Sequence, residues 1–277
     1  MSHDDPQAEP TPDFNELFKE ELRLPQDPQA ETPAERRRKL PPRLLPGHPE
    51  RWDENAKYWA GLWLETLRDE LSGSLRDAEQ LAETCCEYAR LCLLYGNAGE
   101  AIPLAKETLR RLAEQFGKDQ LKAFNQIRRV YSRVFELAFG CRFHAEAIDF
   151  ARFAIDLIVP KPGEPLPDFR HPCLWTRSWT WCIDLSYVLQ AEKRIDEALR
   201  VLDDGAKTCE VFGRKWHRAD IELRATLLAF HLVDQKEGLR RAKHLLQWSH
   251  GELDTSDLRQ RALVLVEEFE VKESDEA

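Results

Sequence analysis

A short pattern returns three times along the chain, each time where a helix is expected to begin after a tight turn. The copies are Gly99-Glu100-Ala101-Ile102, Ala145-Glu146-Ala147-Ile148 and Asp196-Glu197-Ala198-Leu199. Two antiparallel helices joined by a tight turn approach closely beside that turn. An Ala at this point lets the two backbones touch, and an Ile or Leu next to it fills the groove between them. The repetition predicts a chain built from helical hairpins.

Small residues recur farther along the second helix of each hairpin. They are Ala105 in the first copy, Ala151 and Ala154 in the second, and Gly205 and Ala206 in the third. A degenerate fourth copy, Gln235-Lys236-Glu237-Gly238-Leu239, is followed by Ala242 and Leu246. No segment alternates Val, Ile and Thr with polar residues as a strand does, so we expect an all-α body.

Apolar spacing, together with Gly and Pro at segment ends, predicts ten helices. Their ranges are 49–71, 75–95, 99–116, 119–139, 143–159, 172–190, 194–212, 215–233, 236–250 and 255–270. Ser74 is the expected N-cap of the second helix, because a Ser side chain can accept a hydrogen bond from the first backbone N–H groups.

The hairpin openings resemble those of the tetratricopeptide repeat family. The matching features are the Glu-Ala-Ile or Glu-Ala-Leu start of the second helix, the small residue about seven positions on, and Gly96 where the family favours a turn glycine. The resemblance covers roughly residues 75–250. It implies an all-α, right-handed α-α superhelix of about four helical hairpins with flanking helices.

The chain also departs from that family. Its signature alanines are 46 and 51 residues apart, against about 34 in the family, so its helices are longer. The family's Trp, Leu-Gly and Tyr of the first helix are mostly missing, and no closing Pro follows each second helix. A compact helical bundle in which the Glu-Ala triplets coincide by chance is the alternative fold.

The N-terminal part has a different composition. Ten of the 16 prolines lie in the first 50 residues, a stretch with few aromatic residues that cannot hold a packed core. We therefore expect a disordered, Pro-rich acidic arm over residues 1–48, a helical-repeat domain over 49–271 and an acidic tail over 272–277.

One segment of the arm, residues 13–22, is amphipathic. Its apolar side chains fall at i, i+3, i+4 and i+8, on one face of a short helix. They are Phe14, Leu17, Phe18 and Leu22. Such a segment suits docking into a groove of a partner, and it equally suits packing on its own chain. The basic run Arg36-Arg37-Arg38-Lys39 is typical of a solvated linker, with weak contact to an acidic partner or nucleic acid as the alternative.

Composition excludes several classes of function. The formal net charge of −10 argues against a nucleic-acid partner for the whole chain. No apolar run approaches the ~20 residues needed to span a bilayer, and no signal segment begins the chain, so we expect a cytoplasmic protein without a membrane partner. Seven cysteines without a Cys-x-x-Cys pair fit small core side chains in a reducing compartment.

Catalytic and cofactor motifs are missing from the sequence. It has no Gly-rich phosphate loop, no His-Glu-x-x-His and no Gly-x-Ser-x-Gly, and its histidines have no metal-ligand spacing. We therefore expect no cofactor, no metal and no enzymatic activity.

A partner surface is expected on the first helices of the hairpins, which line the inner face of a solenoid. Lys122, Arg129 and Arg133 share one face of the fourth helix at i, i+7 and i+11, with Asn125 beside them. The same surface is expected to include Trp175 and Arg177 on the sixth helix and Arg218 on the eighth. These residues predict a groove for an acidic peptide or a carboxylate terminus. Solvated faces with intrahelical ion pairs are the alternative reading.

Taken together, these patterns predict a non-enzymatic adaptor that binds a protein or peptide segment in a concave helical groove. A regulatory module of the tetratricopeptide-like type, which senses a ligand or peptide, is the second hypothesis. An enzyme with an unrecognised helical active site is the third. A polar cavity with converging titratable groups would favour the second or third hypothesis, and an open groove with exposed Trp and Arg would favour the first.

Overall fold

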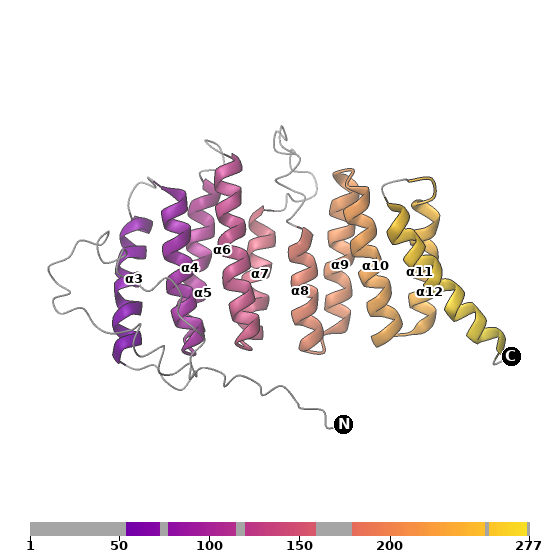
Figure 1. Ribbon diagram of the computed structural model, residues 1–277, viewed down its shortest axis with the longest axis horizontal. Coiled ribbons are helices and arrows are strands. Elements are labelled where there is room, and N and C mark those ends of the chain that lie inside the picture. Colours follow the sequence, from indigo (N-terminus) through magenta and orange to yellow (C-terminus); the bar gives the residue numbers. More distant parts are fainter. Residues whose placement is uncertain (1–53, 73–76, 115–119, 159–178, 253–254, 276–277) are drawn as a thin grey trace, which may run out of the picture. The chain divides into compact units, whose positions relative to one another are not determined.

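The computed structural model describes residues 54–72, 77–114, 120–158, 179–252 and 255–275, and their regular structure is helical (Figure 1). The helices are α3 (Glu54–Ser72), α4 (Ala78–Leu94), α5 (Ala98–Glu114), α6 (Gln120–Gly140), α7 (His144–Ile158), α8 (Trp179–Ala191), α9 (Ile195–Val211), α10 (Lys215–Leu232), α11 (Gln235–Trp248) and α12 (Ser256–Asp275). They pack in consecutive pairs, as α8 on α9 and α10 on α11 show. The prediction of an all-α, tetratricopeptide-like arrangement of helical hairpins is confirmed.

The chain divides into two compact units. The first comprises residues 1–112 and 126–141, and the second comprises residues 113–125 and 142–277. Among the described residues, α3, α4 and most of α5 and α6 belong to the first unit, and α7 to α12 belong to the second.

The repeated signature marks a close helix–helix contact in every copy. Its alanines are fully buried at 0% exposure; they are Ala101, Ala147 and Ala198. Five residues before each of them the backbone adopts the left-handed conformation that turns the chain into the second helix. The φ angle there is 85° at Gly96, 65° at Arg142 and 59° at Lys193. The sequence pattern and the turn geometry therefore repeat together.

At two positions neighbouring helices approach too closely for the Cβ atom of an alanine, and the residue there is glycine. A Cβ atom built on Gly238 of α11 would lie 2.4 Å from Cγ of Phe230 on α10. A Cβ on Gly205 of α9 would lie 3.1 Å from Cβ of Cys182 on α8. Both glycines are required by close approach, since neither has a positive φ angle.

The hydrophobic core of the second unit is shared by its last three helices. One cluster joins α10, α11 and α12 through Leu223, Leu245 and Leu258, which are at most 2% exposed. A second cluster adds Phe230 and Val266. This packing fixes α10 and α11 beside each other, and a polar groove lies over their junction.

The helix bounds differ from the expected ones by a few residues at most ends. The N-cap of α4 is Asp77 rather than Ser74, because the Asp77 side chain accepts hydrogen bonds from the N–H groups of Glu79 and Gln80. At the other end of the chain α12 continues to Asp275, so it includes most of the residues that we expected in the acidic tail.

Candidate binding surfaces

The first candidate surface is a row of polar side chains on α6. Asn125, Arg129 and Arg133 are all exposed and follow one another at i, i+4 and i+8 on one face of this helix. Lys122 lies on the same helix one turn before Asn125, and its side chain is outside the described residues. Among the residues described by the structure, neither Arg129 nor Arg133 forms an ion pair. The row therefore presents two positive charges to an incoming partner.

A neighbouring first helix, α4, carries acidic side chains. The Cys86 thiol of α4 lies 4.0 Å from the carbonyl oxygen of Arg129, so the two helices are in contact. Glu79 and Glu83 of α4 are exposed, and Glu87 forms an ion pair of 2.7 Å with Arg90. Of these two helices, α6 therefore supplies the positive charge.

Several predicted site residues lie outside the described residues. They are Trp175 and Arg177 of the expected sixth helix and Phe14, Leu17, Phe18 and Leu22 of the arm. Their roles stay predictions.

Arg218 belongs to the second unit and has a different environment from the α6 row. Its guanidinium group forms ion pairs with Glu222 at 2.7 Å and Glu210 at 2.8 Å, and it lies 4.2 Å from the ring centroid of Trp248. Only 16% of its side chain is exposed. Arg218 faces the space between two second helices and its charge is already paired, so it is not the exposed cation expected from its place on a first helix.

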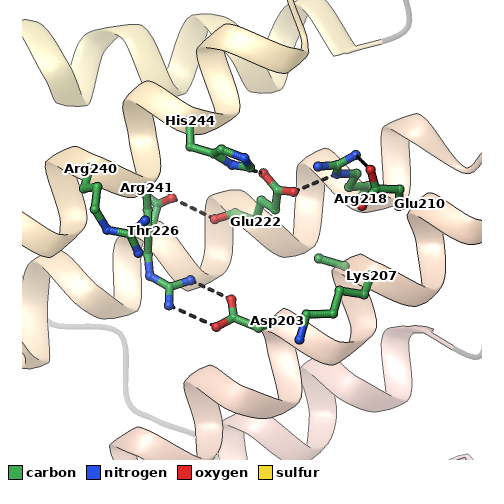
Figure 2. A pocket seen from close by; sticks show the side chains of 10 residues that line it. Asp203, Lys207, Glu210, Arg218, Glu222, Thr226, Arg240, Arg241 and His244 are labelled. Carbon is green, nitrogen blue, oxygen red and sulfur yellow. Dashed lines mark hydrogen bonds and ion pairs between the residues drawn. The ribbon is translucent and has the colours of Figure 1, made fainter.

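That space is a polar groove of about 450 Å³, the second candidate surface (Figure 2). The second helices α9 and α11 form its walls, and the first helix α10 forms its floor. Its lining residues are Asp203, Ala206, Lys207, Glu210, Arg218, Glu222, Thr226, Arg240, Arg241 and His244. We call it the α9–α11 groove.

One end of the α9–α11 groove is closed by a forked ion pair. Arg241 donates to both carboxylate oxygens of Asp203, at 2.6 and 3.0 Å, and Figure 2 shows the two groups facing each other. Arg241 also contacts Glu237 at 2.8 Å, and Arg240 contacts the same carboxylate at 2.6 and 2.7 Å. The hydrogen bond from Arg240, followed by that from Arg241, lowers the pKa of Glu237, and the hydrogen bond to Asp203 raises the pKa of Arg241.

The floor of the groove centres on Glu222. One of its carboxylate oxygens accepts from Arg218, and the other accepts from the Trp248 indole N–H at 2.7 Å. His244 Nδ1 lies 3.5 Å from the second oxygen (Figure 2). These partners come from α10 and α11 and hold a carboxylate that is only 15% exposed.

The opposite face of α10 carries an arginine that contacts an exposed tyrosine of α8. Arg224 donates to the Tyr187 hydroxyl of α8 at 2.5 Å and also contacts Asp220. Tyr187 is 47% exposed, and Trp216, on the same face of α10, is 42% exposed. The sequence analysis did not select Arg224 and Tyr187, nor Asp203, Arg241 and Trp248 of the groove. A Tyr and an Arg on successive first helices are a signal from which the first two could have been predicted.

Metal binding and membrane insertion find no support in the described ranges. No cluster of three or more His, Cys, Asp or Glu side chains there could hold a metal ion. No helix in the same ranges combines the length and apolar character that crossing a bilayer requires. The cysteine thiols that the structure describes are free, and burial raises the pKa of Cys85, Cys92 and Cys182 to about 12.

Among known proteins, the chain is similar to solved structures, and its sequence matches no protein-family model and no curated protein. BtubC from P. vanneervenii is similar over 77% of this chain and 82% of its own, with 15% identity and a TM-score of 0.41. A Podosopora anserina protein assigned as a kinesin light chain, with nearly identical TPR-like repeats, is similar over 72% of this chain and 90% of its own, with 12% identity and a TM-score of 0.39.

A second crystal structure of the Podosopora anserina protein gives the same TM-score of 0.39, over 70% of this chain and 87% of its own. At these TM-scores the neighbours carry no conclusion about function. The consecutive helix pairs and the repeated turn, rather than the neighbours, define the fold. The chain is a tetratricopeptide-like helical repeat with two candidate binding surfaces.

Proposed function

We propose that the chain is a non-enzymatic adaptor that binds an acidic peptide or protein segment along α6. The observation that carries the proposal is the exposed pair Arg129 and Arg133, one helical turn apart and next to Asn125. Charge-assisted hydrogen bonds from arginine to carboxylates are stronger than neutral ones, and an amide side chain suits contact with a peptide backbone.

The rest of the expected site extends this proposal. Lys122 would lengthen the α6 row by one turn, and Trp175 with Arg177 would supply an aromatic contact from the segment before α8. The arm segment 13–22 would recruit a second protein through Phe14 and its apolar neighbours. Arg218 is left out of the row, since it is held by Glu210 and Glu222.

Charge reversal on α6 tests the proposal. The double variant Arg129→Glu, Arg133→Glu should bind a fluorescein-labelled, Glu-rich peptide at least about tenfold more weakly, because two attractive contacts become repulsive. Fluorescence anisotropy measures the affinity, and far-UV circular dichroism should show unchanged helicity, since both side chains are exposed.

A matched control reverses two exposed cations elsewhere. Arg200 and Lys236 lie on α9 and α11, outside the α6 row, so Arg200→Glu, Lys236→Glu changes the net charge equally. Loss of binding in both double variants would indicate attraction by net charge alone and would contradict the proposal. Partners captured from native cells should be lost with the α6 variant and kept with the control.

A regulatory module that senses a ligand or peptide is the second candidate function. The observation that favours it is the α9–α11 groove, in which several titratable groups converge on one polar hollow. Binding of a small molecule there, without any peptide binding on α6, would favour this function over the adaptor.

A further inference from the structure

We propose that the α9–α11 groove is a binding site for a small anion with more than one carboxylate or phosphate group. Lys207 on one wall and Arg240 on the other would hold the anion at the mouth of the groove. The site is separate from the α6 row, and the proposal rests on the second candidate function above, whose ligand class it names.

The inner layer of the groove is electrically balanced. Arg241 is paired with Asp203, and Arg218 is paired with Glu222, while the two guanidinium side chains are only 18% and 16% exposed. Because these buried charges compensate one another, the floor does not strongly repel an anion.

The outer cations are the exposed ones. Lys207 is 73% exposed and contacts Asp204 at 3.1 Å, and Arg240 is 66% exposed and contacts Glu237. Both contacts join residues one turn apart on the same helix. The single contact of Lys207 is an exposed pair of the weak kind, so Lys207 can turn to an incoming anion at little cost. Arg240 donates to both oxygens of Glu237, so it would share its guanidinium between Glu237 and the anion.

The number and spacing of the charges select a multivalent ligand. Four cations and three carboxylates line the groove. Two further carboxylates outside the lining, Asp204 and Glu237, pair with Lys207 and Arg240, so a ligand must carry several negative charges to compete with them. From Asp203 to Glu210 the wall extends roughly 10 Å, seven residues at about 1.5 Å each. The volume of about 450 Å³ lies in the usual range of small-molecule sites.

His244 adds a third group at the mouth. It lies one turn after Arg240 on α11, is 57% exposed, and faces Glu222 across the groove. Its imidazole can donate a hydrogen bond to an anion held by Arg240. Three donors from two helices would then surround the ligand.

Titration of the full chain with citrate and, separately, with pyrophosphate tests the proposal at low ionic strength. Trp248 is the built-in reporter, since its indole N–H donates to Glu222 and its ring lies under Arg218. Its indole resonance in a ¹H–¹⁵N spectrum, assigned with the variant Trp248→Phe, should shift saturably. Calorimetry then gives the affinity.

Removal of the two outer cations provides the decisive comparison. The double variant Lys207→Gln, Arg240→Gln should weaken anion binding at least about tenfold, because it removes both charge-assisted contacts at the mouth of the groove. The control Arg200→Gln, Lys236→Gln removes two exposed cations from the same helices outside the groove and should keep the affinity of the unmodified chain.

The outcomes separate the possibilities. Saturable binding of citrate alone assigns a polycarboxylate ligand, binding of pyrophosphate alone assigns a phosphate ligand, and either supports the site. Shifts that never saturate, or equal weakening in both double variants, would overturn it. Binding of an acidic peptide in the groove without binding of either anion would overturn it as well. The variant Arg129→Glu, Arg133→Glu tests only α6, so the two proposals fail independently.

Discussion

At the scale of single residues, Gly238 has the least room for a side chain among the glycines that the structure describes. A methyl group there would lie 2.4 to 2.8 Å from three ring carbons of Phe230, which is only 7% exposed and cannot swing into solvent without opening the core. Gly238→Ala should lower the free energy of unfolding by about 1–3 kcal/mol, an overpacking cost that exceeds the gain of about 1 kcal/mol in helix propensity.

The control for this substitution is Gly61 on α3, which is exposed and has nothing within 4 Å of an added Cβ. Gly61→Ala should therefore be stabilising by about 0.5–1 kcal/mol. Urea denaturation followed by circular dichroism measures both changes. A stabilised Gly238→Ala variant would show that α10 and α11 are farther apart than the structure has them.

The thiols offer a second test at this scale. Burial raises the pKa of Cys182 to about 12 and also raises that of Cys141, yet Cys141 alone among the described cysteines is partly exposed. In the variant Cys173→Ser, which removes the cysteine outside the described residues, a disulfide reagent should therefore label Cys141 first. Its rate should rise about tenfold per pH unit below the pKa, because the thiolate reacts. Equally fast labelling of Cys182 would contradict the packing of α8 on α9.

Arg218 shows what spacing along a helix cannot predict. Its position on a first helix suggested the inner face, but its partners Glu210 and Trp248 lie on two other helices. Such pairings depend on how three helices are rotated relative to one another, and the side chain can extend to either side. By contrast, Asn125, Arg129 and Arg133 are exposed on one face as their spacing within a single helix required.

At the scale of helices, the signature glutamate links neighbouring elements in three of the four copies. Glu197 accepts from Arg152 of α7 at 2.6 Å, and Glu100 accepts from the Tyr88 hydroxyl of α4 at 3.1 Å. In the fourth copy Glu237 holds Arg240 and Arg241, and Arg241 in turn reaches Asp203 of α9. The repeated Glu thus has a structural role beside the repeated Ala.

This role makes the stability of the second unit depend on pH. Hydrogen bonds from Arg240 and Arg241 lower the pKa of Glu237 in the folded chain. A carboxylate with a lowered pKa stabilises the fold above its unfolded pKa, about 4.3, and that contribution is lost as the pH falls through the folded value. Between about pH 6 and about pH 3.5 the variant Glu237→Gln should lose less stability than the unmodified chain. Urea denaturation at each pH measures the stability of both chains. If their denaturation midpoints fall by the same amount across this range, Glu237 does not have a lowered pKa in the folded chain.

Helix ends were predictable within a few residues because apolar spacing and turn residues act locally. The start of α4 shows the limit of that reasoning. Ser74 and Asp77 are both good N-caps, and Asp77 has the extended backbone, with φ of −141° and ψ of 108°, that lets its side chain reach the N–H groups of the first turn. Which of two suitable residues caps a helix is decided by the chain direction before it, and local composition does not specify that direction.

At the scale of the whole molecule, each unit has a hydrophobic core made by its own helices. In the first unit Trp59, Leu81 and Leu109 come from α3, α4 and α5 and are at most 3% exposed. In the second, Leu223, Leu245 and Leu258 meet across α10, α11 and α12. Arg129 and Arg133 belong to the first unit and the lining of the α9–α11 groove to the second, so binding to each can be measured separately in one chain.

The same reasoning predicts how the chain responds to removal of residues 1–48. Because helices within residues 54–275 supply the clusters of buried side chains named above, a chain of residues 49–277 should keep the melting temperature within about 2 °C. Differential scanning calorimetry of both chains measures this. The deletion of residues 54–72 is the opposing control, since it removes Trp59 and Leu67 from the core and should lower the melting temperature clearly. A large drop on removing residues 1–48 would mean that Phe14 and its neighbours pack on the helical body, and the arm would then be a part of the fold rather than a docking segment for a second protein.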